Sequence, residues 1–242
     1  MQHLSRLAYK IITIVPAYNE AENIGLVVEE TLKYQIISEL LVVDDGSQDK
    51  TAAIAKEKGA NILRHSKNMG VGAAIRSGID YALKNGFDIV TILAGDGQHK
   101  SAEIPALVDP ILKEKYDFVI GSRYLNASTA NNITKFRYIT TKVYTFIFNI
   151  FVGGKFTDVT NGFRAFCIDI FRDKEINLWQ DWLNTYELEP YLFYQLVKRG
   201  YRIKEIPTTL IYHKKAKSHI KPILDWWRII RPLFLLKLKL KK

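Results

Sequence analysis

The chain has little cysteine and no long apolar run. Cys167 is the one cysteine among 242 residues, so an intramolecular disulfide is excluded and a reducing compartment is expected. Residues Met1 to Arg6 lack the apolar core of a signal peptide. No stretch reaches the ~18–20 uncharged apolar residues that a membrane-spanning helix needs. These absences predict a cytoplasmic protein that does not cross a membrane.

The sequence also lacks internal repeats and linkers rich in Pro, Gly and Ser, which argues against several independent domains. With 48% hydrophobic residues, the chain is able to bury a large core in one unit. We predict one domain over residues 8–213, followed by a tail over residues 214–242.

Positive charge is concentrated in this tail. The net charge is +10, of which the tail contributes +9 and the preceding 213 residues +1. A nucleic-acid-binding protein spreads positive charge and aromatic side chains over a folded face. The observed distribution therefore argues against nucleic acid as a partner and favours an anionic membrane surface.

The tail is apolar as well as basic. Five apolar side chains follow helical spacing: Ile223, Trp226, Trp227, Ile230 and Phe234. A basic amphipathic helix of this kind is typical of helices at a bilayer interface, and we predict a peripheral position on the cytoplasmic face of a membrane. The same pattern is compatible with a helix that docks on the protein's own core. The apolar segment Val143–Gly154 predicts either a core helix or one that lines a groove for a lipid chain.

Apolar, β-branched runs alternate with helical periodicity in the first half of the chain. The predicted strands cover Ile11–Val15, Leu40–Val43, Asn61–Leu63 and Ile89–Leu93, and the predicted helices cover Ala21–Leu32, Gln48–Lys58 and Val71–Lys84. This alternation predicts an α/β fold with a mostly parallel sheet and helices on both faces. In such folds the ligand crevice lies beyond the carboxyl ends of the strands.

Polar side chains gather where the predicted strands end. They are Tyr18, Asn19 and Glu20 after the first strand, Asp44 and Asp45 after the second, and Asp96 and Gln98 after a later one. Carboxylate and amide oxygens suit Mg²⁺ or Mn²⁺ beside a diphosphate, so Asp96 and Gln98 are candidate metal ligands. Several of these residues are equally compatible with helix caps, and Asn68–Gly72 predicts either a phosphate loop or a plain turn. No G-x-G-x-x-G follows the first strand, which argues against an NAD enzyme.

Six ordered motifs resemble those of family 2 glycosyltransferases of GT-A fold, and within them the dolichyl-phosphate (polyprenyl-phosphate) hexose synthases. They are Val15–Glu20, Val43–Ser47, Asn68–Arg76, Ala94–His99, Gly121–Arg123 and Asp158–Arg164. The resemblance covers roughly residues 10–220. It implies metal-dependent transfer of a hexose, with inversion, from a nucleotide-diphosphate sugar to a polyprenyl phosphate.

The resemblance also implies roles for individual residues. The nucleotide sugar is expected at Pro16, Ala17, Tyr18, Glu20, Asp44, Asp45, Gly70, Gly95, Asp96, His213, Lys214 and Lys215, and the metal at Asp96 and Gln98. The lipid phosphate is expected at Arg123, Arg137 and Thr141, and Asp96, Arg123 and Arg137 are the expected catalytic residues. An Arg fork suits phosphate geometry, although Arg123 and Arg137 are also compatible with ion pairs.

The chain departs from the family pattern at several positions. Ala94 stands where many relatives carry the first Asp of an Asp-x-Asp pair, and His213, Ala216 and His219 replace the Arg, Gly and Lys of a later basic segment. A UDP-hexose or UDP-N-acetylhexosamine is therefore at least as well supported as GDP-mannose. Four other functions stay open: a different acceptor, a sugar-1-phosphate nucleotidyltransferase, a non-catalytic nucleotide-sugar-binding or membrane-binding protein, and a nucleic-acid binder suggested only by the pI of about 9.5.

Overall fold

A computed structural model describes residues 9–126, 130–131, 133–211 and 222–241. Its centre is a seven-stranded sheet in the order β3-β2-β1-β4-β7-β5-β8. The strands of this sheet are β1 (Ile11–Ala17), β2 (Glu39–Asp44), β3 (Asn61–Arg64), β4 (Ile89–Ile92), β5 (Phe118–Ser122), β7 (Arg164–Cys167) and β8 (Ile203–Pro207). A second, two-stranded sheet pairs β6 (Ala130–Asn131) with β9 (Leu210–Ile211).

The sheet is parallel except for β7, which runs antiparallel to both β4 and β5. This arrangement confirms the predicted mostly parallel α/β fold. β1 lies inside the sheet, between β2 and β4, and its side chains are almost all buried. Such burial explains why β1 is a continuous apolar run, since a parallel strand covered on both faces has no solvent side.

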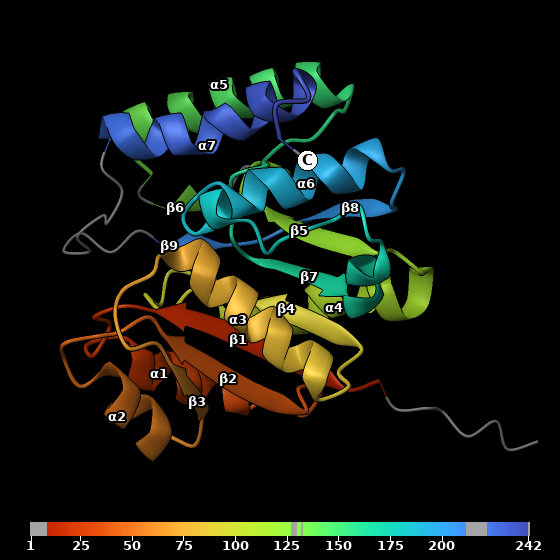
Figure 1. Ribbon diagram of the computed structural model, residues 1–242. Coiled ribbons are helices and arrows are strands. Elements are labelled where there is room, and N and C mark those ends of the chain that lie inside the picture. Colours follow the sequence, from red (N-terminus) through yellow and green to blue (C-terminus); the bar gives the residue numbers. More distant parts are fainter. Residues whose placement is uncertain (1–8, 127–129, 132, 212–221, 242) are drawn as a thin grey trace, which may run out of the picture.

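Helices cover both faces of the sheet, as Figure 1 shows. They are α1 (Ile24–Leu32), α2 (Thr51–Glu57), α3 (Val71–Lys84), α4 (Ile104–Glu114), α5 (Lys135–Val152), α6 (Leu188–Lys198) and α7 (Pro222–Lys237), with short 3₁₀ turns at Ser101–Glu103, Ile168–Arg172 and Asp181–Leu183. One apolar core joins the sheet to α3, α5, α6 and α7, and a second joins its other face to α1 and α4.

Two predicted helices begin about one turn later than expected. Residues 21–23 form a turn in which the Glu20 carbonyl accepts N–H groups from Asn23 and Ile24, so α1 begins at Ile24. Before α2, the Asp49 carboxylate accepts the backbone N–H of Thr51 at 2.9 Å. In both places local polar contacts compete with helical hydrogen bonds.

α5 and α7 lie side by side in a layer beyond α6 (Figure 1). The rings of Phe151 and Phe234 meet with centroids 5.1 Å apart, and the Tyr144 hydroxyl donates to the Ile229 carbonyl at 3.1 Å. Leu233 and Leu236 are buried. Part of the predicted tail therefore docks on the protein's own core, while the boundary at residues 213 and 214 stays a prediction.

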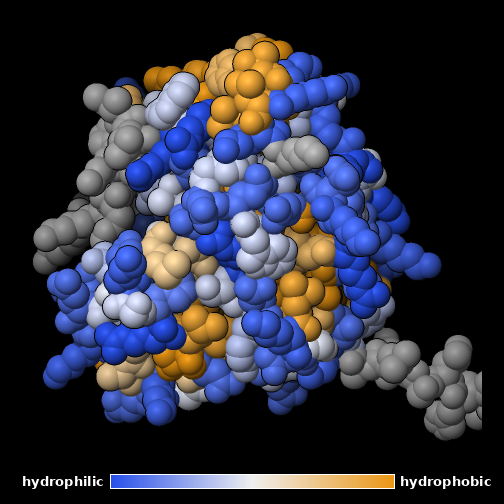
Figure 2. All heavy atoms as spheres, viewed as in Figure 1, coloured by the Kyte–Doolittle hydropathy of each residue, from blue (hydrophilic) through white to orange (hydrophobic). Residues whose placement is uncertain are grey.

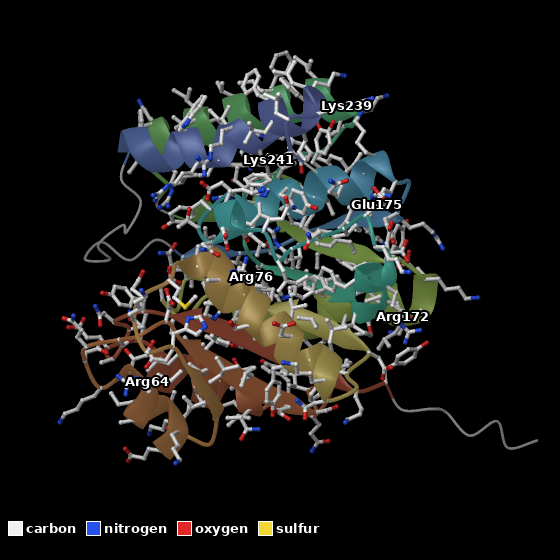
Figure 3. All side chains as sticks on the ribbon, viewed as in Figure 1. Arg64, Arg76, Arg172, Glu175, Lys239 and Lys241 are labelled. Carbon is white, nitrogen blue, oxygen red and sulfur yellow. The ribbon has the colours of Figure 1, made fainter. Side chains whose placement is uncertain are left out.

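A segment after β7 packs against α3, the helix on which Figure 3 labels Arg76. Arg76 donates to the Leu178 carbonyl at 3.0 Å and to the Asn184 side chain at 2.5 Å. Gly72 lies so close to this segment that a Cβ there would overlap the Leu183 carbonyl. Among the residues that the structure describes, every helix is too short or too polar to cross a bilayer.

Candidate functional site

The carboxyl ends of β1, β2 and β4 lie next to one another at one edge of the sheet. Ala17 and Asp44 are partners in the register of β1 and β2. A Cβ added at Gly95 would stand 3.1 Å from the Cβ of Ala17 and 3.2 Å from the Pro16 carbonyl oxygen. The fold thus brings together the predicted residues Pro16, Ala17, Asp44 and Gly95.

Asp44 presents a buried carboxylate at this edge. Its Oδ1 accepts the backbone N–H of Ser47 at 3.0 Å. Its Oδ2 lies 2.9 Å from Arg64 Nε but, within the described part of the chain, receives no aligned hydrogen bond. Oδ2 is thus ion-paired with the Arg64 guanidinium and retains an unused hydrogen-bond acceptor position.

Asp45 has a different environment from Asp44. Its carboxylate accepts backbone N–H groups from Met69 and Gly70 at 2.9 and 2.8 Å, and its Oδ1 lies 2.7 Å from His65 Nδ1. The other ring nitrogen of His65 lies 2.9 Å from the Ser77 hydroxyl. Asp45 therefore holds the turn before α3 against the end of β2, and the backbone N–H of Gly70 is one of the donors in this contact.

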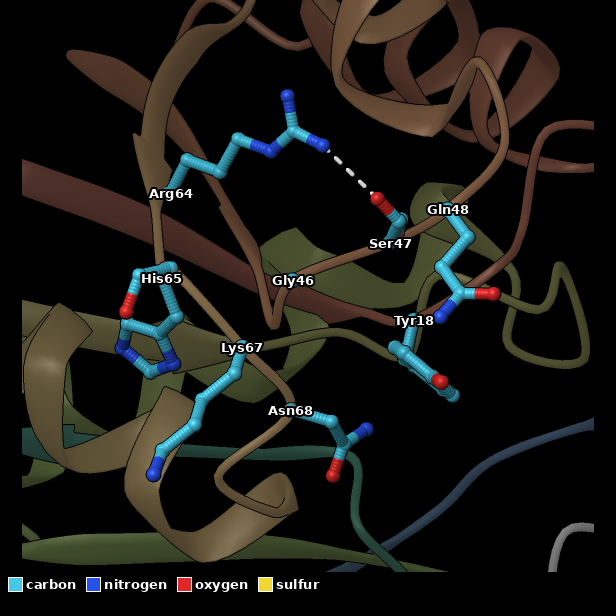
Figure 4. Close-up of a pocket in the computed structure, with 9 residues that line it drawn as sticks. Tyr18, Gly46, Ser47, Gln48, Arg64, His65, Lys67 and Asn68 are labelled. Carbon is cyan, nitrogen blue, oxygen red and sulfur yellow. Dashed lines mark hydrogen bonds between the residues drawn. The ribbon is translucent and has the colours of Figure 1, made fainter.

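A pocket of about 590 Å³ opens beside these loops (Figure 4). It is lined by Tyr18, Gly46, Ser47, Gln48, Arg64, His65, Ser66, Lys67 and Asn68. Arg64 donates to the Ser47 carbonyl at 2.8 Å across its rim. Gly46 has a φ of +73°, and a Cβ there would overlap the Lys67 backbone, so the narrow crossing of the two loops requires glycine.

Arg64, Gln48 and Lys67 were not among the predicted binding residues. Arg64 ends β3 just as Asp44 ends β2, so its position at the end of a predicted strand was the available signal. Gln48 and Lys67 lie on loops and reach the pocket only through the folded path of those loops. No local sequence pattern identifies either residue as part of a binding site.

Glu20 lies at the start of the loop before α1. Its backbone N–H donates to the Thr51 hydroxyl at 2.8 Å, and its carboxylate accepts from the Asn23 side chain at 2.8 Å. The neighbouring Asn19 has a φ of +55° and exchanges hydrogen bonds with residues 47 and 48. These bonds hold the loop that carries Tyr18 against the loop after β2.

Asp96 and Gln98 share one turn after β4. Gly97 has a φ of +72°, and the backbone N–H of Gln98 donates to Asp96 Oδ1 at 3.0 Å. The described residues hold no cluster of three or more His, Cys, Asp or Glu side chains suited to a metal ion. A half-buried carboxylate and amide fit Mg²⁺ or Mn²⁺ if diphosphate oxygens and water complete the shell, as is usual for magnesium.

His99 follows this turn and joins it to the motif at 158–164. Its ring stacks on Phe163 with centroids 5.0 Å apart, and its Nε2 lies 3.0 Å from Asn161 Oδ1. Burial lowers the pKa of His99 to about 4, although the nearby Asp96 charge acts in the opposite direction. His99 is therefore neutral at pH 7, and its enclosed Nδ1 has no hydrogen-bond partner among the described residues.

Arg123 forms a buried ion pair with Asp158. Its Nε and Nη2 donate to the two carboxylate oxygens at 2.6 and 2.7 Å, and Nη2 also contacts the Thr160 hydroxyl. Burial alone raises the pKa of Asp158, but the Arg123 charge and hydrogen bonds hold that pKa below its usual value. The ion pair considered for Arg123 is thus present, and it is buried.

Thr141 and Arg137 lie in the N-terminal half of α5. The buried Thr141 hydroxyl donates to the Arg137 carbonyl at 2.9 Å and lies 2.5 Å from the Tyr124 hydroxyl. Lys142 Nζ stands 4.0 Å from the centroid of the Tyr124 ring. Tyr124, which follows Arg123 in sequence, therefore links the end of β5 to α5, a role that the sequence did not indicate.

Glu187, before α6, is a further buried acid that the sequence did not single out. It accepts from Arg231 of α7 at 2.5 Å and from the Thr185 hydroxyl. Nearby, Arg164 pairs with Glu189 at 3.0 Å.

The predicted residues His213, Lys214 and Lys215 lie outside the described residues.

Comparison with known proteins gives relatives over nearly the whole chain. An uncharacterized protein of Methanocaldococcus jannaschii is 32% identical over 95% of this chain and 93% of its own length. A polyprenol monophosphomannose synthase of Mycolicibacterium smegmatis is 27% identical, covering 84% of this chain and 78% of its own. A UDP-N-acetylglucosamine–dolichyl-phosphate N-acetylglucosaminyltransferase of Methanococcus voltae is 28% identical, covering 94% and 96%.

The fold matches solved glycosyltransferase structures. Glucosyl-3-phosphoglycerate synthase of Mycobacterium tuberculosis, crystallised with Mn²⁺, UDP and phosphoglyceric acid, superposes with a TM-score of 0.70 at 17% identity, covering 95% of this chain and 78% of that one. The model of the family described as "Glycosyl transferase family 2" matches residues 12–173. This chain is a glycosyltransferase and belongs to glycosyl transferase family 2.

Proposed function

We propose that this enzyme transfers a hexose from a nucleotide-diphosphate sugar to a polyprenyl phosphate, with inversion at the anomeric carbon. The observation that carries the proposal is the meeting, at one sheet edge, of a nucleoside-sized pocket, the Asp44 oxygen that lacks an aligned donor among the described residues, and the turn that carries Asp96 and Gln98. Relatives named for polyprenyl-phosphate and dolichyl-phosphate acceptors support the choice of acceptor.

The pocket favours a uridine donor. Uracil offers one N–H between two carbonyl groups, whereas guanine offers adjacent N–H groups that match both oxygens of a carboxylate. Asp44 has Oδ1 engaged by Ser47 and only Oδ2 without an aligned donor from the described residues. Arg64, half-exposed beside it, supplies N–H groups for a carbonyl. We therefore expect UDP to bind more tightly than GDP.

Asp96 and Gln98 are the proposed ligands of Mg²⁺ or Mn²⁺. When bound, the cation neutralises charge on the departing diphosphate. His213, Lys214 and Lys215 are proposed to add further positive charge there as point charges. Pro16, Ala17, Tyr18 and Glu20 supply one wall of the nucleotide site, and Asp45 with Gly70 holds the opposite wall in place.

The acceptor needs little activation. A phosphate monoester, with a second pKa near ~6, is already largely dianionic at neutral pH. One of its oxygens forms a bond to the anomeric carbon as the bond from that carbon to the nucleotide diphosphate breaks, and the electron pair leaves with the nucleotide. Arg123, Arg137 and Thr141 are proposed to orient the acceptor phosphate, so catalysis depends on positioning and charge.

The proposed acceptor places the enzyme at a membrane. We propose that residues 214–242 contribute to contact with the anionic cytoplasmic leaflet, because this segment carries most of the net charge. The buried Leu233 and Leu236 restrict that contact to the outer side of α7.

The test is a transfer assay with a panel of UDP- and GDP-sugars, Mg²⁺ or Mn²⁺ and a short-chain polyprenyl phosphate, with the glycolipid identified by mass. Asp96→Asn should lower turnover by about a hundredfold or more. Asp109→Asn is the matched control, because Asp109 is an exposed acid of α4 that pairs with Lys113. The control should retain wild-type turnover.

Three outcomes would contradict the proposal. They are transfer to 3-phosphoglycerate but not to the lipid phosphate, an unchanged anomeric configuration in the product, and wild-type turnover in Asp96→Asn. Tighter binding of GDP than of UDP would contradict the assignment of Asp44 alone.

A further inference from the structure

The outer side of α5 is apolar and exposed. Phe136, Ile139, Val143, Phe146 and Ile150 recur at alternating intervals of three and four residues, and each is between 51% and 67% exposed. Residues at these intervals lie on one side of a helix. We call these five side chains the α5 stripe. Large apolar side chains that line up at the surface indicate an interaction site.

The stripe is not a part of the core that is merely poorly covered. The opposite side of α5 is already packed, with Thr141, Tyr144, Thr145, Phe148 and Val152 buried. The helix therefore has one apolar side inside the protein and a second one outside. Figure 2 shows apolar side chains gathered at the top of the molecule, over the layer of α5 and α7.

α7 packs beside α5 and carries exposed apolar side chains of its own. Trp227 and Phe234 are exposed, and Phe234 contacts Phe151 of α5. Leu238 and Leu240 continue the exposed apolar residues beyond α7, where Lys239 and Lys241 also lie (Figure 3).

The charged residues of α5 are all basic. α5 carries Lys135, Arg137 and Lys142 and no Asp or Glu, and Lys237 ends α7. A second copy of this face would bring cations against cations with no acid on α5 to pair with them. An anionic lipid surface supplies both the apolar interior and the negative charge that this face lacks.

We propose that the α5 stripe inserts into the headgroup region of an anionic bilayer, with the exposed aromatic residues of α7 beside it. The helix would lie in the plane of the membrane, buried by roughly 5–10 Å. One consequence rests on the proposed function: Arg137 and Thr141 belong to the same helix, so the phosphate of a membrane-held acceptor would meet its ligands at headgroup depth. The membrane contact is thus assigned to α5 as well as to the tail.

The test is co-sedimentation of the full chain with vesicles of phosphatidylcholine and phosphatidylglycerol that contain no polyprenyl phosphate. Ile139→Glu/Phe146→Glu should weaken vesicle binding by at least about tenfold, because it places two carboxylates in the bilayer interface. Leu26→Glu, at an equally exposed leucine of α1 on the other side of the sheet, is the matched control and should bind as the wild type does.

A second variant guards against misfolding. Ile139→Ala/Phe146→Ala keeps good helix formers without added charge, and its vesicle binding should fall between those of the wild type and the glutamate variant. Equal binding by the wild type and the alanine and glutamate variants would overturn the proposal, as would equal loss in Leu26→Glu. A wild-type dimer that the glutamate variant dissociates in sedimentation velocity without vesicles would also overturn it, since a second copy would then be the occupant.

The vesicle assay is independent of the proposed reaction. It contains neither donor nor acceptor, so its failure leaves glycosyl transfer untouched. Conversely, transfer to a water-soluble short-chain polyprenyl phosphate, without vesicles, tests the reaction and should be retained by Ile139→Glu/Phe146→Glu.

Discussion

Removing the charge of Asp158 is expected to destabilise the protein strongly. Asp158 accepts two hydrogen bonds from the Arg123 guanidinium and further ones from the backbone N–H groups of Arg123 and Thr160. Both side chains of the pair are nearly inaccessible, at 5% and 0% exposed. Asp158→Asn leaves a buried guanidinium without its counter-charge, which costs about 3–5 kcal/mol of unfolding free energy.

That magnitude is measurable, because a domain is stabilised by roughly 5–15 kcal/mol in total. Urea unfolding followed by circular dichroism should show a lower midpoint for Asp158→Asn with an unchanged slope. The double variant Arg123→Gln/Asp158→Asn removes both charges, so its destabilisation should be smaller than the sum of the two single effects by about 2 kcal/mol.

Two results would refute this reasoning. One is a loss below about 1 kcal/mol in Asp158→Asn, the value of an exposed ion pair. The other is additivity of the single variants, which would mean that the two side chains do not interact.

Three further predictions concern turns, thiol reactivity and pH. Gly46→Ala should lower the unfolding free energy measured in urea by about 3 kcal/mol, because the φ of Gly46 is positive and an added Cβ would overlap the Lys67 backbone. The control Gly86→Ala, at a residue with φ +67° and nothing within 4 Å of the added Cβ, should lower it by about 1 kcal/mol. Equal losses would contradict the close crossing of the two loops at Gly46. Cys167, whose pKa is raised to about 11 by burial and then by Asp117, should react with iodoacetamide at pH 8 at least ~100-fold more slowly than a free thiol, and a comparable rate would be contrary to the structure. The folded-state pKa of His99 is lowered to about 4, so its contribution to stability is present above pH 6.5 and is lost as the pH falls toward 4, by about 3 kcal/mol. The unfolding free energy of His99→Gln should lack this part of the pH dependence, and an identical pH profile would refute the assignment.

The sequence predicts the frame of the site well. Strand β1 and the turns after β2 and β4 have local signatures, namely an apolar run followed by polar or glycine residues, and parallel strands bring their carboxyl ends together wherever the loops go. Asp44, Gly95 and Asp96 therefore reach one edge as expected. Helix α3 begins and ends at the predicted residues.

The partners of those residues could not be predicted in the same way. Whether Asp44 or Asp45 has an oxygen without a donor depends on which backbone N–H groups the next loop presents, and residues 65–70 supply them to Asp45. The pairing of Arg123 with Asp158 joins positions 35 residues apart. Periodicity likewise shows that α5 is apolar, but α6 and α7 decide which of its sides is buried.

The clamp that Asp45 forms on Met69, Gly70 and His65 has a consequence for ligand affinity. Two connections that leave different strands are fixed to a single carboxylate, so the walls of the proposed nucleotide pocket are set before any ligand arrives. A nucleotide then loses its own freedom on binding but does not have to order the loops that receive it. The enzyme thereby keeps more of its contact energy for discriminating between bases.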